Sequence, residues 1–204
     1  MALHTADSLI TAPMLEPLDL EEVKKHLRFG STTEDTLIDG WIVGARQYFE
    51  AQTGRQILTA TWELWLDGFP PDEIELPYPP LQSVTSVKYI DLTGNLQTVT
   101  STDYVVEAPV GPFAGRGRIR RAFGTVWPSP QPRPAAVRIR FLAGYGDQPG
   151  DVPDLVRGAL YFLVGHFHRH REEATSETLM RLPMGARIIM DAYRSRQTVT
   201  PRWV

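Results

Sequence analysis

Apolar residues in the first quarter of the chain recur with the period of an α-helix. The positions that share one face over residues 33–54 are Leu37, Ile38, Trp41, Ile42, Ala45, Tyr48 and Phe49. Glu34 and Asp35 suit the positive N-terminal end of such a helix, and Gly54 can adopt the left-handed conformation that ends it. The pattern therefore predicts a long helix here.

Three further helices are expected. Residues 18–28 predict a shorter first helix, because Asp19 can cap its free amides while Glu22, three residues later, can complete a capping box. In the C-terminal half, residues 153–170 predict a long helix opened by a proline, and residues 183–193 predict a short last one. The long helix is apolar on more than one face, which indicates a central position or contact with a neighbour.

From residue 57 the hydrophobic period changes to two, as in a β-strand. Leu58, Ala60, Trp62, Leu64 and Leu66 fall on one side. Further strands are expected over residues 73–76, 84–91, 96–99, 104–106, 118–120 and 137–141, with a hairpin turn at Thr93-Gly94-Asn95. The expected fold class is α+β: a helical part, residues 1–56 and 143–204, with a β-rich antiparallel insertion over residues 57–142.

Composition narrows the setting of the protein. The 204 residues include no cysteine, which excludes disulfides and thiolate metal sites and favours a reducing compartment such as a cytoplasm. No stretch has the length of a membrane span or the pattern of a signal peptide. With a net charge of -3, any contact with nucleic acid must come from a local patch.

Residue patterns that could support catalysis are weak. Gly144, Gly146 and Gly150 lie between a strand and a helix, but nearby carboxylates would repel phosphate, so we expect a turn and not a nucleotide site. His166 and His170 share a helix face, but no glutamate occupies the position used in zinc proteases. We expect core or interface histidines, no metal and no cofactor.

Four arginines, Arg116, Arg118, Arg120 and Arg121, lie close together in the sequence. They fit two interpretations, a flexible cationic loop that meets phosphate or an acidic partner, or a basic hairpin tip.

The order of motifs resembles the head-to-tail connector (adaptor) family of tailed bacteriophages, prophages and phage-like gene transfer agents. In the helices the resemblance is carried by Val23-Lys24-Lys25-His26-Leu27-Arg28, Ala45-Arg46, Glu50 and Thr53-Gly54-Arg55. In the strands it is carried by Thr61-Trp62, Phe69-Pro70, Leu76-Pro77, Pro80-Leu81, Ser83-Val84, Ser86-Val87 and residues 89–91. It continues through Trp127-Pro128, Ala143-Gly144-Tyr145-Gly146, Val152-Pro153, Arg171-Glu172, Pro183 and Tyr193-Arg194.

The resemblance implies a structural subunit and not an enzyme. Such a subunit would form a homo-oligomeric ring, a dodecamer, between the portal protein and a stopper or tail-completion protein, and double-stranded DNA would pass through its lumen without sequence specificity. It would assemble in the host cytoplasm, away from any membrane, and reside in the neck of the particle. The alternatives are another neck or tail-completion component, or a small metal-dependent enzyme that uses His166 and His170.

Three sets of residues follow as candidate contact sites. The candidates for portal binding are Tyr193, Arg194, Arg196, Arg202 and Trp203, because arginine and aromatic residues are strong interface anchors. The candidates for contact with DNA or a neighbouring ring are Arg116, Arg118, Arg120 and Arg121. The candidates for contact between subunits are Tyr161, Phe162 and His166 on the long C-terminal helix.

Overall fold

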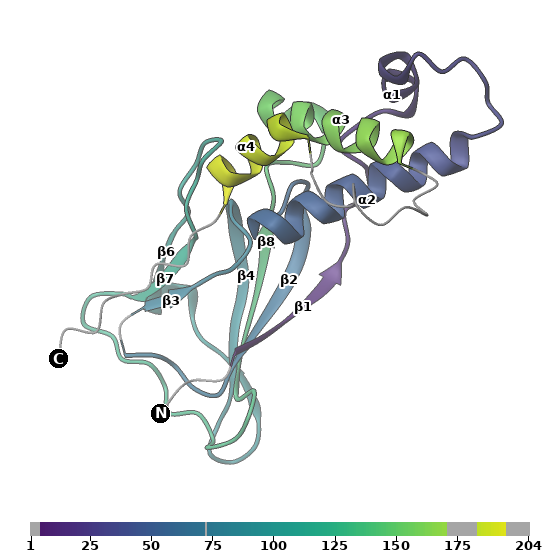
Figure 1. Ribbon diagram of the computed structural model, residues 1–204. Coiled ribbons are helices and arrows are strands. Elements are labelled where there is room, and N and C mark those ends of the chain that lie inside the picture. The colour runs from purple at the N-terminus through teal and green to yellow at the C-terminus, as the bar shows by residue number, and fades with distance from the viewer. Residues whose placement is uncertain (1–4, 72, 171–182, 195–204) are drawn as a thin grey trace, which may run out of the picture.

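The computed structural model describes residues 5–71, 73–170 and 183–194, and over these residues the fold is mixed α+β, as predicted. The α-helices are α1 (Leu20–Leu27), α2 (Asp35–Thr53), α3 (Asp154–Arg169) and α4 (Met184–Tyr193). The strands are β1 (Thr5–Thr11), β2 (Ala60–Leu66), β3 (Glu73–Glu75), β4 (Leu81–Ile90), β5 (Leu96–Thr98), β6 (Tyr104–Glu107), β7 (Arg118–Arg121) and β8 (Val137–Ala143). Two 3-10 turns are η1 (Ser101–Asp103) and η2 (Pro149–Asp151). Figure 1 shows the helices gathered at one end of the strands.

Local capping chemistry sets the ends of the first two helices. The Asp19 carboxylate accepts hydrogen bonds from the backbone N–H groups of Glu21 (2.9 Å) and Glu22 (3.1 Å), which confirms the predicted N-cap of α1. Helix α1 then ends at Arg28, whose φ of 57° is left-handed. Helix α2 ends at Gly54 with φ 65°, as expected for a glycine that closes a helix.

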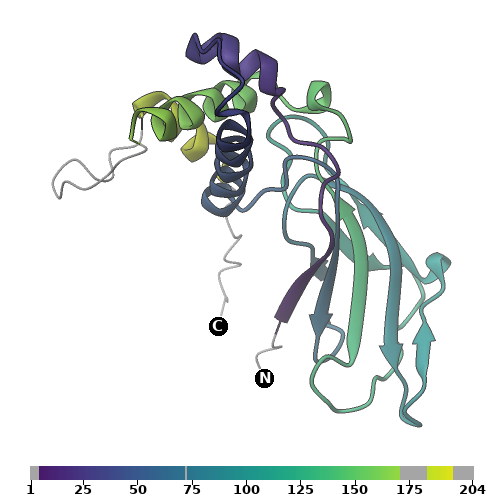
Figure 2. The same ribbon diagram turned by 90° about the vertical axis from the view of Figure 1, so that its right-hand side faces the viewer.

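The strands form two antiparallel sheets. The larger has the order β1-β2-β8-β4-β5 and the smaller the order β3-β7-β6. The predicted hairpin is present, since β4 pairs with β5 around the turn at residues 91–95. In Figure 2 the purple strand β1 lies at one margin of the larger sheet and the teal β5 at the other.

Strand β1 was not predicted from the sequence. It pairs with β2 from Thr5 opposite Leu66 to Thr11 opposite Thr61, with a register shift between Leu9 and Thr11. The alternation of apolar and polar residues in this segment is broken by the adjacent pair Leu9 and Ile10, so the period-two pattern is lost. The larger sheet thus receives a strand from outside residues 57–142.

Two hydrophobic clusters form the interior. One gathers the inward faces of the helices, with Phe49, Leu160 and Leu163 completely buried. The other lies between the two sheets and is centred on Phe141, Ile139 and Ile119. No helix in the described part of the chain is both long and apolar enough to cross a membrane.

Candidate assembly surfaces

A buried polar network joins the helices to the larger sheet. The Arg46 guanidinium binds both oxygens of Glu16 (2.8 and 3.1 Å) and one oxygen of Glu50 (2.9 Å). The other Glu50 oxygen accepts a hydrogen bond from the side-chain N–H of Gln56 (2.8 Å). The side-chain oxygen of Gln56 accepts one from the Trp62 indole N–H (3.0 Å). The network therefore fixes α2 relative to β2 and to the segment that follows β1.

Burial and the Arg46 charge act in opposite directions on the pKa of Glu50. Burial raises the pKa of Glu50, while the Arg46 charge and the backbone N–H of Ile57 lower it, and burial has the larger effect. Both oxygens of the Glu50 carboxylate have donors, since Arg46 donates to one oxygen while the Gln56 side chain and the Ile57 N–H donate to the other. Composition and spacing did not indicate this network, because Glu16 lies 30 residues from Arg46 and the Gln56 contacts join a helix to a strand.

The arginine-rich segment forms a strand in the interior of the smaller sheet. Strand β7 lies between β3 and β6, and Ile119 is completely buried against the core. Neither the flexible loop nor the hairpin tip is correct for Arg118–Arg121, because burial of Ile119 and hydrogen bonds on both sides hold the segment extended. The strand predicted over residues 118–120 is confirmed.

Glutamates on the flanking strands pair with these arginines. Arg120 lies 2.8 Å from Glu73 and 3.2 Å from Glu107, and Arg118 lies 3.4 Å from Glu75. The Glu73 hydrogen bond raises the pKa of Arg120. Arg116 also lies 3.8 Å from Glu75, so three arginines face three glutamates, whereas Arg121 donates to the carbonyl oxygen of Pro71. A phosphate would have to compete with these carboxylates.

The residues predicted to bind the portal separate into two groups. Tyr193 is 1% exposed and packs against Phe49 (ring centroids 6.2 Å apart) and Phe113 (4.6 Å). Tyr193 is therefore part of the scaffold in this structure, whereas Arg194 is exposed and lies 3.4 Å from Asp191. Arg196, Arg202 and Trp203 lie outside the described residues.

Arg55 fixes the point at which the chain leaves helix α4. Its Nε donates to the carbonyl oxygen of Tyr193, and its Nη1 lies 3.4 Å from the Tyr145 hydroxyl. That hydroxyl donates to the carbonyl oxygen of Pro112 (2.6 Å). Burial raises the pKa of Tyr145 to about 12, so the phenol stays protonated and keeps this hydrogen bond.

The residues predicted for subunit contact also differ from one another. The Tyr161 hydroxyl donates to Glu22 (2.9 Å), and its ring lies 5.0 Å from that of His26, so Tyr161 packs α1 against α3. Glu22 was expected to complete a capping box but accepts this bond instead. Phe162 is 47% exposed, and its ring lies beside Gly185, where an added Cβ would approach it to 3.0 Å. Phe162 is thus the exposed apolar member of the set.

The histidines near the end of α3 contact one another and aromatic rings in tilted and edge-to-face arrangements. The His166 and His170 rings lie 4.5 Å apart, and His168 lies 5.4 Å from Trp41. Within residues 5–71, 73–170 and 183–194, no three histidine, aspartate or glutamate side chains are arranged to hold a metal ion. The geometry of His168 is that of packing at the surface of the helical core.

Gly144, one of the residues that carry the resemblance, has a steric role. Its φ is +129°, and a Cβ at this position would lie 2.5 Å from the carbonyl carbon of Leu58. Only glycine permits this approach of the chain after β8 to the start of β2.

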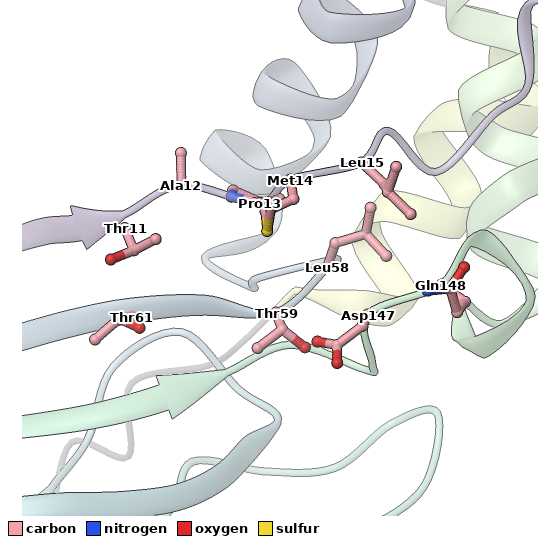
Figure 3. Close-up of a pocket in the computed structure, with 10 residues that line it drawn as sticks. All are labelled: Thr11, Ala12, Pro13, Met14, Leu15, Leu58, Thr59, Thr61, Asp147 and Gln148. Carbon is pink, nitrogen blue, oxygen red and sulfur yellow. The ribbon is translucent and has the colours of Figure 1, made fainter.

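A pocket of about 550 Å³ lies where the chain leaves β1. Its lining consists of Thr11, Ala12, Pro13, Met14, Leu15, Leu58, Thr59, Thr61, Asp147 and Gln148. Figure 3 shows residues 11–15 along one wall and the start of β2 along the other. Sequence reasoning missed this pocket because one wall depends on the unpredicted strand β1.

A family model and several solved structures match this chain, whereas the curated proteins do not. Residues 17–108 match the family described as phage gp6-like head-tail connector protein. None of the curated proteins matches this chain.

Solved structures from gene transfer agent (GTA) particles share the fold. A chain from the neck of an empty GTA particle, computed with C6 symmetry, has a TM-score of 0.78 and 23% identity, covering 97% of this chain and 99% of that chain. A chain from the native GTA virion has a TM-score of 0.76 and 22% identity, covering 95% and 97%. A chain from the native GTA neck, computed with C12 symmetry, has a TM-score of 0.76 and 20% identity, covering 99% and 100%.

The family match spans α1, α2 and strands β2 to β6. The resemblance to the head-to-tail connector family that the sequence indicated is thus confirmed, and residues 17–108 carry it.

Proposed function

We propose that this chain is the adaptor subunit in the neck of a tailed phage or phage-like gene transfer agent. Copies of it form a ring, a dodecamer, between the portal protein and a stopper or tail-completion protein, and double-stranded DNA passes through the ring. The family match over residues 17–108 carries the proposal. The near-complete overlap with chains of GTA necks agrees with it, although at this identity it shows the fold alone.

The proposed role is structural and requires no catalytic residue or cofactor. Subunits would assemble in the host cytoplasm and then reside in the neck. The helices of residues 1–56 and 143–204 would supply subunit contacts through the exposed Phe162 of α3. The β-rich part, residues 57–142 together with β1, would form the rest of the ring wall. Exposed apolar side chains such as Phe162 (47% exposed) typically mark protein contacts.

Electron microscopy of particles from a strain that lacks this gene tests the proposal. We expect heads separated from tails, empty or leaking DNA, and restoration of tailed particles by the wild-type gene. Normal tailed particles from the deletion strain would refute the role in joining.

Binding to purified portal distinguishes the adaptor from another neck component. We expect the full chain to bind the portal, and a chain that ends at Arg194 to keep its fold but lose most of this binding, because Arg196, Arg202 and Trp203 are then absent. The variant Arg187→Ala, on the exposed surface of α4, is the matched control and should bind normally. A full chain that binds an isolated tail-completion protein but not the portal would favour the other neck component.

The arginines of β7 are the proposed contact with DNA or with the next ring. Arg121 donates to the carbonyl oxygen of Pro71 (3.1 Å) and is exposed, whereas Arg118 and Arg120 are paired with glutamates. Contact with phosphate therefore needs rearrangement of the Arg118 and Arg120 ion pairs. Replacing all four arginines by glutamine should reduce DNA retention in particles, and unchanged retention and neck assembly would remove them from the interface.

A further inference from the structure

A fully exposed phenylalanine projects from the turn that follows β7. Phe123 has the full exposure of a free side chain, and Val126, three residues later, is 78% exposed. Large apolar side chains exposed in this way typically mark a contact with another protein. Aromatic side chains are also the most common anchors of such contacts.

The turn that carries Phe123 is firmly held. The Thr125 hydroxyl contacts the carbonyl oxygens of Asp103 (3.0 Å) and Ala122 (2.8 Å), and the Ala122 N–H donates to the same Asp103 oxygen (2.9 Å). Gly124 supplies the left-handed conformation with φ +79°. The backbone that carries the phenyl ring is therefore held in place, so binding would have to order the Phe123 side chain and not the turn.

The apolar pocket of Figure 3 lies at the opposite edge of the larger sheet. Strand β1 forms one edge of this sheet and leads into the pocket. Strand β5 forms the other edge and is followed by η1, whose Asp103 carbonyl oxygen accepts from Ala122 in the Phe123 turn. The pocket offers Ala12 and Pro13 with the exposed Met14 (96%) and Leu15 (45%), and its polar lining includes Asp147. One chain therefore carries an apolar projection beside one edge and an apolar recess beside the other.

We propose that Phe123 of one copy enters the pocket beside β1 of the next copy. The inference rests on the proposed function, because it names the contact that closes the proposed ring. A contact between two different surfaces of the same chain is heterologous, and repetition of such a contact gives a closed ring when the rotation per subunit divides a full turn. The pocket, at about 550 Å³, has room for a phenyl ring.

Site-specific crosslinking tests the contact directly, because the natural chain has no cysteine. The full chain with Val126→Cys, which keeps Phe123 and places the thiol three residues after it, is mixed with the full chain with Ala12→Cys, assembled on purified portal, and treated with a short bis-maleimide. We expect a crosslinked dimer from the mixture, and a ladder that extends to the complete ring from the chain with both substitutions. The matched control pairs Val126→Cys with Leu96→Cys, which lies on β5 at the same edge as the Phe123 turn and should give little product.

The outcomes separate this contact from the proposed function. The contact is overturned if rings form on the portal but the pair with Ala12→Cys gives no crosslinked dimer. It is also overturned if the pair with Leu96→Cys gives as much dimer. Either result leaves the adaptor role standing. Crosslinking of Val126→Cys to the portal or another protein in place of the Ala12 variant also overturns the contact. If the wild-type chain forms no ring on the portal, both the contact and the proposed function fail.

A second variant tests the strength of the contact. Phe123→Asp should weaken ring assembly about tenfold or more, because it removes a buried aromatic ring and places a charge in an apolar pocket. Its thermal unfolding should match the wild type, since the side chain is exposed within the subunit. Val110→Asp, 91% exposed on the loop before β7, is the control and should assemble normally. Normal assembly of Phe123→Asp would contradict the proposal.

Discussion

Arginines at the helix–sheet junction and arginines on β7 have opposite environments. Arg46 and Arg55 are 9% and 4% exposed, and both hold distant segments together. The side chains of Arg118 and Arg120 are 32% and 48% exposed, and their partners lie on strands beside them. Arginines that are isolated in the sequence are thus the structural ones, whereas the conspicuous cluster lies at the surface.

The degree of burial determines how much each arginine ion pair contributes to the free energy of unfolding. A buried ion pair that loses one partner leaves an uncompensated charge away from water, which costs far more than the loss of a pair that water can replace. The clustering of arginines along the sequence does not predict how much each ion pair stabilises the fold. It shows neither how deeply each side chain is buried nor which acidic residues lie beside it in the folded chain.

The largest predicted effect is that of Arg46→Met. Glu16 and Glu50 would lose their shared cation, and we expect the free energy of unfolding to fall by about 3–5 kcal/mol. Arg120→Met is the matched control, and it should destabilise the fold much less than Arg46→Met because its side chain is 48% exposed. Urea denaturation of both variants provides the measurement. Equal losses would show that burial does not separate the two regions.

Arg55→Met should have the next largest effect. Removal of the guanidinium leaves the buried carbonyl oxygen of Tyr193 without this donor, and we expect a loss of about 1.5–3 kcal/mol, as for a hydrogen bond to a charged group. Amide hydrogen exchange should become faster in α4. Arg187→Met, whose side chain is 75% exposed on the same helix, should change stability by about 0.5 kcal/mol or less. Unchanged exchange in the Arg55 variant would contradict its role in anchoring α4.

The parts of the fold that were predictable are those determined by local sequence. Asp19 and Gly54 mark helix ends through chemistry within a few residues, and the turn at residues 93–95 lies inside its own hairpin. Strand β1 could not be predicted, because it is an edge strand with an interrupted alternation whose partner, β2, lies far along the chain.

The candidate sites were predictable only as residue types. The arginine cluster was visible in the sequence, but its pairing with Glu73 and Glu107 depends on strands from both sides of the smaller sheet. Tyr193 is of a residue type that is common at interfaces, yet Arg55 and the surrounding aromatic rings bury it. Side-chain partners distant in sequence therefore decide which residues remain available to another protein.

Glu73→Gln tests whether its carboxylate limits the attraction of β7 for phosphate. Glu73 lies 2.8 Å from Arg120 and 3.6 Å from Arg118, so its neutralisation leaves both arginines less compensated. We expect several-fold tighter non-specific binding to a short DNA duplex, with a steeper salt dependence between about 50 and 200 mM salt, measured by fluorescence anisotropy. Asp39→Asn, on the exposed face of α2, makes the same change in net charge away from β7. Equal effects of the two variants would show that only net charge matters.

The smallest predicted effect concerns Asp91, an exposed group that is nevertheless firmly held. Hydrogen bonds from Thr93 (2.6 Å from its hydroxyl), Gln97 (2.8 Å) and the Asn95 backbone (2.9 Å) lower the pKa of Asp91 to about 2. Because the folded-state pKa lies below the ordinary value of 3.8, the stabilisation is complete above that value and is lost as the pH falls towards 2.

The Asp91 carboxyl can be titrated directly by NMR. We expect a midpoint near pH 2 in the wild type. Thr93→Val should raise the pKa towards its ordinary value, because the first of the hydrogen-bonding groups is then missing, whereas Thr98→Val on β5 should leave it unchanged. A wild-type midpoint near 3.8 would mean that the hairpin turn is not held by this carboxylate in solution. The exposed fraction of a charged side chain would then be enough to predict that it contributes little to stability. The difference between the buried and the exposed arginines would hold for carboxylates as well.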